Sequence, residues 1–196
     1  MHTSFMQADK LNFDPRPQMG AIFADGFGHL LKFFSRDTKR LAKAFAHTFD
    51  LQCFYVAVQG DTILAMTACT NGVSPVTFDK AICRKELGFF RGGLAHVMLT
   101  KYIANHKFPF DFAADMGRIE IVATAAAFRG KGIAHGLIKH IMQATPYTHY
   151  VLVVVEGNTP AIKLYEKLGL KVIKKVEMPP IIKQASKINS FLYMKS

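Results

Sequence analysis

The sequence predicts one α/β (α+β) domain, built on a mixed, mostly antiparallel sheet with helices on both faces and one parallel strand pair. Two apolar runs, 52–58 and 62–70, flank a short polar turn, which is typical of an antiparallel hairpin. Over 117–156, an apolar run, a glycine loop, a helical stretch and a second apolar run indicate a β-α-β unit with parallel strands. Two further strand-like runs, 170–178 and 190–195, close the chain.

The length and composition fit a single domain spanning residues 1–196. Half of the residues are hydrophobic, which allows a sizeable core and excludes the intrinsically disordered class. No apolar run approaches the roughly 18 residues that a membrane-spanning helix needs. Residues 1–10 lack the basic and then apolar pattern of a signal peptide. We therefore expect a cytoplasmic protein with no membrane partner.

In the first quarter of the chain, residues 1–25 contain two prolines and show no clear period, so we expect an irregular lead-in. Ser35 is the candidate N-cap of a helix that runs to about Phe49. The apolar positions Leu41, Phe45 and Phe49 recur at four-residue spacing, which is typical of one helix face.

The segment 71–115 is predicted to be a long insertion with a helical stretch over 94–104. Aromatic residues gather in it, at Phe89, Phe90, Phe108, Phe110 and Phe112. Two interpretations stay open: the rings form a satellite hydrophobic cluster, or they line a substrate pocket.

The stretch 117–142 is the centre of the functional argument. Its strand, 118–124, leads into a loop with glycines at Gly130 and Gly132, and a helical period begins at Ile133. Amides of a glycine loop can approach an anion closely, and a helix N-terminus adds unpaired N–H groups and a positive dipole end. This arrangement predicts a phosphate-binding device.

The type of phosphate ligand is less constrained. The Walker pattern of a P-loop is absent. The G-x-G-x-x-x-G run from Gly130, followed by Glu156 after the next strand, leaves a dinucleotide-binding site as an alternative. Against it, Gly130 falls several residues past its strand, and too little chain follows for a second nucleotide-binding half.

The last third of the chain continues the β-α-β pattern. The run 148–156 is almost entirely apolar, which predicts a strand buried on both faces and parallel to 117–124. Thr159 is the candidate N-cap of the next helix, with Pro160 at its first helical position (N1) and Gly169 just past its end.

Two motifs in this part of the chain resemble the GNAT N-acetyltransferase superfamily. The R-x-x-G-x-A pattern at Arg129–Ala134 resembles the family's motif A, which binds the pyrophosphate of acetyl-coenzyme A. Downstream, N-T-P-A at 158–161 and L-Y-E-K-L-G-L at 164–170 resemble the family's "N-x-x-A…Y-E-K-x-G-F" segment. Family members usually carry proline where this chain has Ala126, which affects the expected loop conformation. The detailed match covers about 117–176.

The resemblance implies a GNAT-like sheet whose parallel pair is splayed, and acetyl-coenzyme A as cosubstrate with no metal. The backbone of Val122, Ala123 and Thr124 would pair with the pantetheine arm, with an N–H near Val122 on the thioester carbonyl. Asn158 would contact the cofactor arm, although a helix cap explains it equally. The pyrophosphate would lie on the backbone amides of Arg129, Gly130, Lys131, Gly132, Ile133, Ala134 and His135.

Two side chains are candidate catalytic groups. By resemblance, Tyr165 would lie near the sulfur and act as general acid; the alternative is a ring packed in the core. Glu120 is a carboxylate in an otherwise apolar strand, where burial would raise its pKa toward the range of a general base. The alternative is an ion pair with Arg118 or Lys101.

The remaining composition narrows the partners. Three cysteines show no metal-binding spacing and are expected to be buried thiols in a reducing compartment. The net charge of +11 suits a polyanionic cofactor, and because the lysines are dispersed we expect no nucleic-acid partner. The favoured function is acetyl-coenzyme A-dependent acetylation of a small-molecule or peptide amine. Alternatives are a non-catalytic coenzyme A-binding module and, third, a dinucleotide-dependent oxidoreductase; the sequence leaves homodimerisation open.

Overall fold

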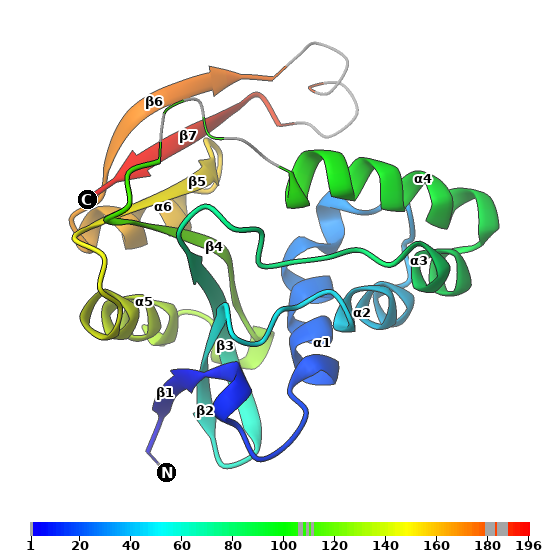
Figure 1. Ribbon diagram of the computed structural model, residues 1–196, viewed down its shortest axis with the longest axis horizontal. Helices are drawn as coiled ribbons and strands as arrows, with labels where there is room; N and C mark the ends of the chain where they lie inside the picture. Colours follow the sequence, from blue (N-terminus) through cyan, green and yellow to red (C-terminus); the bar gives the residue numbers. More distant parts are fainter. Residues whose placement is uncertain (1, 106–107, 109, 111, 179–182, 184–187) are drawn as a thin grey trace.

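The computed structural model of the protein describes every residue except 1, 106–107, 109, 111, 179–182 and 184–187 (Figure 1). The strands are β1 (Ser4–Gln7), β2 (Phe54–Gln59), β3 (Thr62–Thr70), β4 (Met116–Thr124), β5 (His149–Val155), β6 (Lys171–Glu177) and β7 (Ser190–Lys195). The helices are α1 (Arg16–Phe27), α2 (Thr38–Ala46), α3 (Lys80–Leu87), α4 (Phe89–Leu99), α5 (Ile133–Ala144) and α6 (Thr159–Lys167). Shorter helical turns are η1 (Ala8–Lys10), η2 (Gly28–Leu30), η3 (Thr100–Ala104) and η4 (Ala126–Phe128).

Among the described residues, seven strands form one sheet in the order β1-β2-β3-β4-β5-β7-β6. The pair β4–β5 is parallel and the other neighbouring pairs are antiparallel. The hairpin β2–β3 turns at Gly60, whose φ is +56°. The predicted mixed, mostly antiparallel sheet with one parallel pair is confirmed. It is not the doubly wound parallel sheet of a dinucleotide-binding domain, so the structure gives the oxidoreductase alternative no support.

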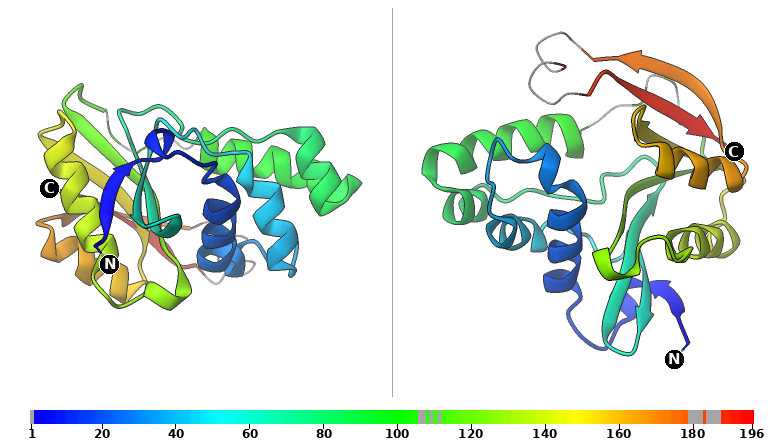
Figure 2. Two further views of the ribbon diagram at one scale, coloured as in Figure 1. Left: turned by 90° about the horizontal axis from the view of Figure 1, so that it is seen from below. Right: turned by 180° about the vertical axis from the view of Figure 1, so that it is seen from behind.

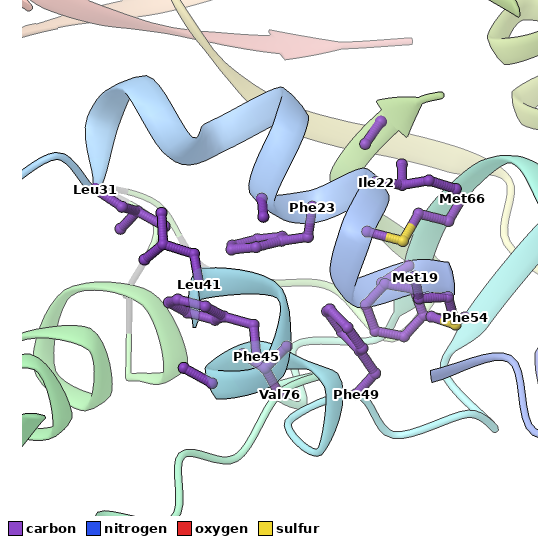
Figure 3. Packing of buried hydrophobic residues seen from close by; sticks show 14 of the residues in the cluster. Met19, Ile22, Phe23, Leu31, Leu41, Phe45, Phe49, Phe54, Met66 and Val76 are labelled. Carbon is purple, nitrogen blue, oxygen red and sulfur yellow. The ribbon is translucent and has the colours of Figure 1, made fainter. Parts of the chain in front are cut away.

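Helices cover both faces of this sheet (Figures 1 and 2). Helices α1 to α4 lie on one face, where Phe23 packs against Phe45 at a ring-centroid distance of 4.7 Å and against Phe49 at 5.9 Å (Figure 3). Helices α5 and α6 lie on the other face, where Leu137 and Leu152 are buried in a second cluster. Burying one large apolar side chain stabilises the fold by roughly 1.5–3 kcal/mol, so both helix layers stabilise the sheet. Strand β4 lies between the two layers.

Residues 1–25 do not form the irregular lead-in that the sequence pattern suggests. They contain β1, which pairs antiparallel with β2, and most of α1. Pro15 immediately precedes the first helical residue of α1. Proline is tolerated at the start of a helix and breaks a helix only when it lies in the helix interior, so Pro15 is compatible with α1. Helix α1 contains Gly20, a residue that usually argues against a helix interior. Its lack of a side chain is explained by close packing, since a Cβ at Gly20 would lie 2.5 Å from the carbonyl oxygen of Ala42 in α2.

The ends of α2 also differ from the prediction. Asp37, not Ser35, is the N-cap, and its Oδ1 accepts hydrogen bonds from two amides of the first turn at 2.9 and 3.2 Å. The Ser35 hydroxyl instead accepts from the Asp37 amide at 3.0 Å. The helix ends at Ala46, and Phe49 forms an isolated bridge with Val76.

Helix α6 begins one residue earlier than predicted. Its N-cap is Asn158, whose Oδ1 accepts from the Ala161 amide at 3.3 Å, and Thr159 is already helical. Pro160 is therefore the second helical residue and not, as predicted, the first, but it still lies in the first turn, where a missing N–H is tolerated. Gly169 follows the helix with a φ of +89°, which confirms its predicted role at the C-terminal end.

The segment 71–115 holds more helix than the predicted 94–104. Helix α3 begins after Asp79, whose carboxylate accepts from the Ile82 amide at 2.8 Å. Helix α4 follows after Gly88 and passes into the π-helical turn η3. The segment therefore adds α3 beside α2 and α4 beside α3, and then returns to the sheet at β4.

The five phenylalanines that the sequence analysis singled out in this segment divide into two groups. Phe89 and Phe90 are 63% and 86% exposed on α4. Phe108 lies at the centre of the other group, with ring-centroid distances of 5.4 Å to Phe110 and 5.6 Å to Phe112. This second group alone lies near β4, since Phe108 packs against a β4 side chain, as described below.

Within the described part of the chain, no helix is long and apolar enough to cross a membrane.

Candidate active site at the opening between β4 and β5

The strands β4 and β5 are paired only at their beginnings. The Cα partners are Met116 with His149, Gly117 with Tyr150, and Arg118 with Val151. Beyond these pairs β4 continues to Thr124 without entering the parallel ladder. The splayed parallel pair is therefore present, and the backbone groups of 119–124 that face β5 lie outside the β4–β5 ladder.

A β-bulge interrupts the other edge of β4 at the same level. On β3, Met66 pairs with Ala123 and Ala68 with Glu120, so two β4 residues, Ile121 and Val122, stand opposite Thr67. Ile121 has a φ of +54°, which is strained for a β-branched residue. Such bulges redirect backbone groups and are enriched beside active sites. The bulge bears directly on the backbone of Val122, one of the predicted binding positions.

The loop after β4 presents backbone amides at the start of α5. Gly130 and Gly132 have φ values of +75° and +76°, a left-handed conformation that favours glycine. The first backbone bond of α5 runs from Gly136 N to Gly132 O at 3.0 Å, so the amides of Ile133, Ala134 and His135 lie ahead of it. A Cβ added at either left-handed glycine would meet no heavy atom of the described structure within 4 Å, so the space above the loop is open. The loop has the form of an anion cradle at a helix N-terminus.

The two cations of the loop are used differently. Arg129 donates from Nε to the Thr124 carbonyl at 3.1 Å, and its guanidinium pairs with Asp25 of α1. Arg129 therefore ties the loop to the helix layer. The Lys131 ammonium lies 5.2 Å from the centroid of the Phe128 ring. Backbone groups, more than these side chains, define the cradle.

A cavity of about 190 Å³ lies at the opening between the strands. Its lining includes Glu120 and Arg118 from β4 and Phe108 from the 71–115 segment. The remaining lining side chains are apolar and come from η3, β4, β5 and β7: Ile103, Ile119, Ile121, Val153 and Phe191. The structure thus brings the predicted base candidate and one of the five predicted aromatics to the same cavity.

Glu120 is held by a buried cation. Its Oε1 accepts from the guanidinium of Arg118, whose side chain is 5% exposed, while that of Glu120 is 17% exposed. The Arg118 guanidinium carbon lies 4.7 Å from the centroid of the Phe108 ring, so the cation is stacked on the ring. The second oxygen, Oε2, has no hydrogen-bond partner among the described residues. One carboxylate oxygen is therefore paired with Arg118, and the other is buried without a hydrogen-bond partner among the described residues.

Burial has the largest effect on the pKa of the Glu120 carboxyl group. Desolvation raises its pKa from 4.5 to about 7, and the charge and hydrogen bond of Arg118 oppose this rise. A carboxylate with a pKa near neutrality can both accept a proton and give it up at the working pH. The alternative from the sequence, an ion pair with Arg118, is present and does not exclude this role.

Tyr165 lies on the other face of the sheet. It is 5% exposed within the cluster under α5 and α6, and burial raises the pKa of its phenol. It does not line the cavity that contains Glu120. The structure therefore places the two candidate catalytic groups on opposite faces of the sheet, and only Glu120 lines the cavity. Asn158 acts as the α6 cap through its Oδ1.

A larger cavity, about 430 Å³, lies near the start of β2 and the end of α5. Cys53 and Cys69 line it, and burial raises the pKa of these thiols to about 11 and about 12. Both thiols stay protonated at neutral pH and are poor nucleophiles. No charged side chain is among its described lining residues. Nor do the described residues contain a group of three or more side chains able to hold a metal ion. The β4–β5 opening is the better candidate site.

Sequence reasoning missed most of the cavity wall. Ile103, Val153 and Phe191 are ordinary apolar residues of separate elements, and nothing in their local pattern marks them as site residues. The stacking of Phe108 on Arg118 was equally hidden, because ten positions of chain separate them. The i, i+2 spacing of Arg118 and Glu120 was visible, since it places both side chains on one face of a strand.

Comparisons with known proteins agree with this geometry. The family model described as "Acetyltransferase (GNAT) family" matches residues 24–170. The mycothiol acetyltransferase of Corynebacterium glutamicum is 38% identical over 61 residues, which cover 30% of this chain and 21% of that protein. An N-acetyltransferase structure from Staphylococcus aureus Mu50 superposes with a TM-score of 0.62 at 18% identity, covering 98% of this chain and 100% of the other.

The ribosomal-protein-S18-alanine N-acetyltransferase of Escherichia coli superposes with a TM-score of 0.55 at 12% identity, covering 99% of this chain and 92% of that one. At 18% and 12% sequence identity, the two superpositions establish a shared fold and nothing further. The family model carries the assignment, because it spans most of the chain and includes β4, the amide cradle and α6. The chain belongs to the GNAT acetyltransferase family.

Proposed function

We propose that the protein transfers the acetyl group of acetyl-coenzyme A to a primary amine by direct attack. One observation carries the proposal: β4 leaves its parallel partner after Arg118, between an amide cradle at Gly130–His135 and a cavity that contains Glu120. On this proposal, the opening would join a binding place for the phosphate-bearing cofactor to a binding place for the amine. The cosubstrate would supply an acetyl group activated as a thioester.

The residues around the opening fit coenzyme A. The backbone of Val122, Ala123 and Thr124 would pair with an extended arm, because these groups lie outside the β4–β5 ladder. The amide of Val122, beside the bulge, would donate to the thioester carbonyl oxygen. Pyrophosphate oxygens would accept from cradle amides at the α5 N-terminus. Asn158 would contact the arm only through atoms that the α6 cap leaves available.

Glu120 would act as the base. A primary amine is mostly protonated at neutral pH and must lose a proton before its nitrogen can attack the acetyl carbon. Oε2 of Glu120 faces no other described donor, so it can accept this proton, directly or through one water. As the new C–N bond forms, the C–S bond breaks and the sulfur leaves with the electron pair. The nitrogen then still carries one proton more than the amide product, and it releases this second proton to water.

Tyr165 would act as the acid that protonates the departing sulfur. Because burial raises the pKa of the phenol, Tyr165 keeps its proton at neutral pH and can donate it. Its position in the α5–α6 layer sets it across the sheet from Glu120. Proton removal and proton delivery would thus come from different sides of the opening.

The partners follow from this chemistry. We propose a small-molecule or peptide amine as acceptor, a cytoplasmic location, no metal and no nucleic-acid partner; a homodimer is compatible with these proposals. The Corynebacterium glutamicum relative is named for mycothiol, but the shared 61 residues cover a fifth of that protein, so its acceptor is not carried over.

The test is binding followed by turnover. Coenzyme A should raise the melting temperature, with a stabilisation of about 2.7 kcal/mol at one hundred times its dissociation constant, and NADPH should not. Purified protein with acetyl-coenzyme A and a panel of amines should release free thiol at a rate that depends on the amine. Coenzyme A binding without amine-dependent thiol release would instead support the non-catalytic binding module.

A further inference from the structure

The walls of the β4–β5 cavity are almost entirely apolar. Six of its eight described lining residues have hydrocarbon or phenyl side chains: Ile103, Phe108, Ile119, Ile121, Val153 and Phe191. These side chains come from η3, the following loop, β4, β5 and β7, so apolar groups face the cavity from several directions. A ligand group that enters the cavity exchanges water for hydrocarbon contacts.

The charged groups of the cavity are one cation and one anion. Arg118 and Glu120 are paired with each other, and no further Asp or Glu is among the described lining residues. Glu120 Oε2, which is buried and has no described hydrogen-bond partner, is therefore the one carboxylate oxygen among the described lining residues that is not already paired. A second ammonium would meet hydrocarbon or the Arg118 guanidinium, and an unpaired charge in such surroundings is strongly unfavourable.

The size of the cavity and the net charge of the protein both disfavour large or multiply charged acceptors. The cavity volume of about 190 Å³ is below the approximately 300–1,000 Å³ of common small-molecule pockets. It suits a single residue or a short hydrocarbon group better than an oligosaccharide. The net charge of +11 repels polycations before they reach the site.

From these observations, and resting on the proposed function, we infer that the acceptor is a primary amine carrying one positive charge on an apolar group. Polyamines and aminoglycosides are excluded as preferred acceptors. The same chemistry is offered by a free alkyl or arylalkyl amine, by the N-terminus of a peptide with an apolar first residue, and by a lysine side chain within a peptide. The amine nitrogen would lie at Glu120 and the apolar group against the cavity wall.

The experiment compares matched acceptors at a single near-physiological ionic strength. Pentylamine and 1,5-diaminopentane have the same carbon chain and differ by one charge. The source is distinguished by three further arms: phenethylamine, a peptide with N-terminal leucine, and an N-terminally blocked peptide with one lysine. Spermidine and kanamycin represent the polycations. Initial thiol-release rates with saturating acetyl-coenzyme A give kcat/KM for each acceptor.

We expect pentylamine to exceed 1,5-diaminopentane at least about tenfold in kcat/KM, which corresponds to 1.4 kcal/mol. At least one of the other monoamine arms should exceed spermidine and kanamycin by a similar factor. A polycation equal to or better than every monoamine would overturn the inference and leave amine acetylation standing. No turnover with any amine, in protein that binds coenzyme A, would overturn both.

An added carboxylate provides an independent check. Ile103→Glu places a second acid in the cavity wall, and Ile103→Gln is its neutral control of similar size. The ratio of diamine to monoamine kcat/KM should rise at least about fivefold in the Glu variant relative to the Gln variant. An unchanged ratio, in two variants with matching melting temperatures, would contradict the cavity as the acceptor site.

Discussion

The cradle at Gly130–His135 presents backbone amides from one continuous stretch of chain, whereas the cavity around Glu120 is walled by side chains from several distant elements. The cradle depends on two left-handed glycines and a helix start, and on the proposed function it would bind the pyrophosphate of the cosubstrate. The cavity depends on which side chains η3, β5 and β7 happen to carry. On the proposed function, cofactor binding and acceptor choice would therefore depend on different parts of the sequence, and mutations should impair them separately.

The strongest test of this separation is Glu120→Gln. The substitution keeps the size of the side chain and a hydrogen-bond acceptor for Arg118 but removes the base, so we expect kcat to fall by about 10² to 10⁴. Affinity for coenzyme A should change by less than about twofold, because the cradle is untouched. Steady-state thiol release and calorimetric binding give the two values. A kcat within about threefold of wild type would remove Glu120 as the base.

Tyr165→Phe should have the next largest effect. It removes the phenolic proton and keeps the ring that packs under α5 and α6. Because a coenzyme A thiolate is a fair leaving group unaided, we expect the low end of the usual loss, about 10² in both kcat and kcat/KM. Thermal melting of the variant serves as the control for packing. An unaltered kcat in a stable variant would assign Tyr165 to the core alone.

The pH dependence tests the electrostatics of the cavity. The folded pKa of Glu120 is about 7, above its ordinary 4.5. Activity should therefore rise with pH through about 7 as Oε2 becomes free to accept a proton. The stability contribution has the opposite sign: between these two values the unfolded chain has lost the proton and the folded chain keeps it, so stability falls as pH rises.

Glu120→Gln should abolish that share of the pH dependence of stability, measured as the difference in urea midpoint between about pH 5 and pH 7. A wild-type activity profile that is flat across this range would show that no group with a pKa near 7 limits the reaction. A matching stability slope in wild type and variant would assign the slope to other groups.

The aromatic residues of 71–115 provide the smallest expected effect and a matched control. Phe108→Ala removes a cavity wall and the ring that stacks on Arg118, so the acceptor KM should rise several-fold, while the KM for acetyl-coenzyme A stays constant. Phe90→Ala alters a ring that is 86% exposed on α4 and should change neither constant. Equal effects of the two substitutions on the acceptor would separate this segment from acceptor binding.

The same contrast explains what the sequence could predict. The β4–loop–α5–β5–α6 part was predictable because its signals are local: an apolar run, Gly130 and Gly132, a helical period and a second apolar run. The antiparallel hairpin and the closing strands are marked by turns and alternating patterns in the same way. Backbone functions, such as the amide cradle, follow from this local conformation.

The remainder depends on packing between distant segments. Pro15 suggested an irregular segment, yet it immediately precedes α1. The packing of this helix could not be predicted, because the close contact of Gly20 with α2 exists only in the folded chain. Ser35 and Thr159 are residue types that often cap helices, but the observed N-caps are Asp37 and Asn158. The side-chain oxygen of each accepts a hydrogen bond from an amide of the first helical turn. Cavity residues such as Val153 and Phe191 carry no local sign of function.

The central claim is that cofactor affinity resides in the cradle backbone and not in the cavity. It is tested most directly by measuring the dissociation constant of coenzyme A for wild type, Gly132→Val and Glu120→Gln by calorimetry. Valine at a φ of +76° is strained by roughly 1–2 kcal/mol or more, which should displace the amides at the α5 N-terminus. We predict at least about tenfold weaker binding by Gly132→Val and unchanged binding by Glu120→Gln. Unchanged affinity in a folded Gly132→Val variant, or a loss confined to Glu120→Gln, would contradict the account.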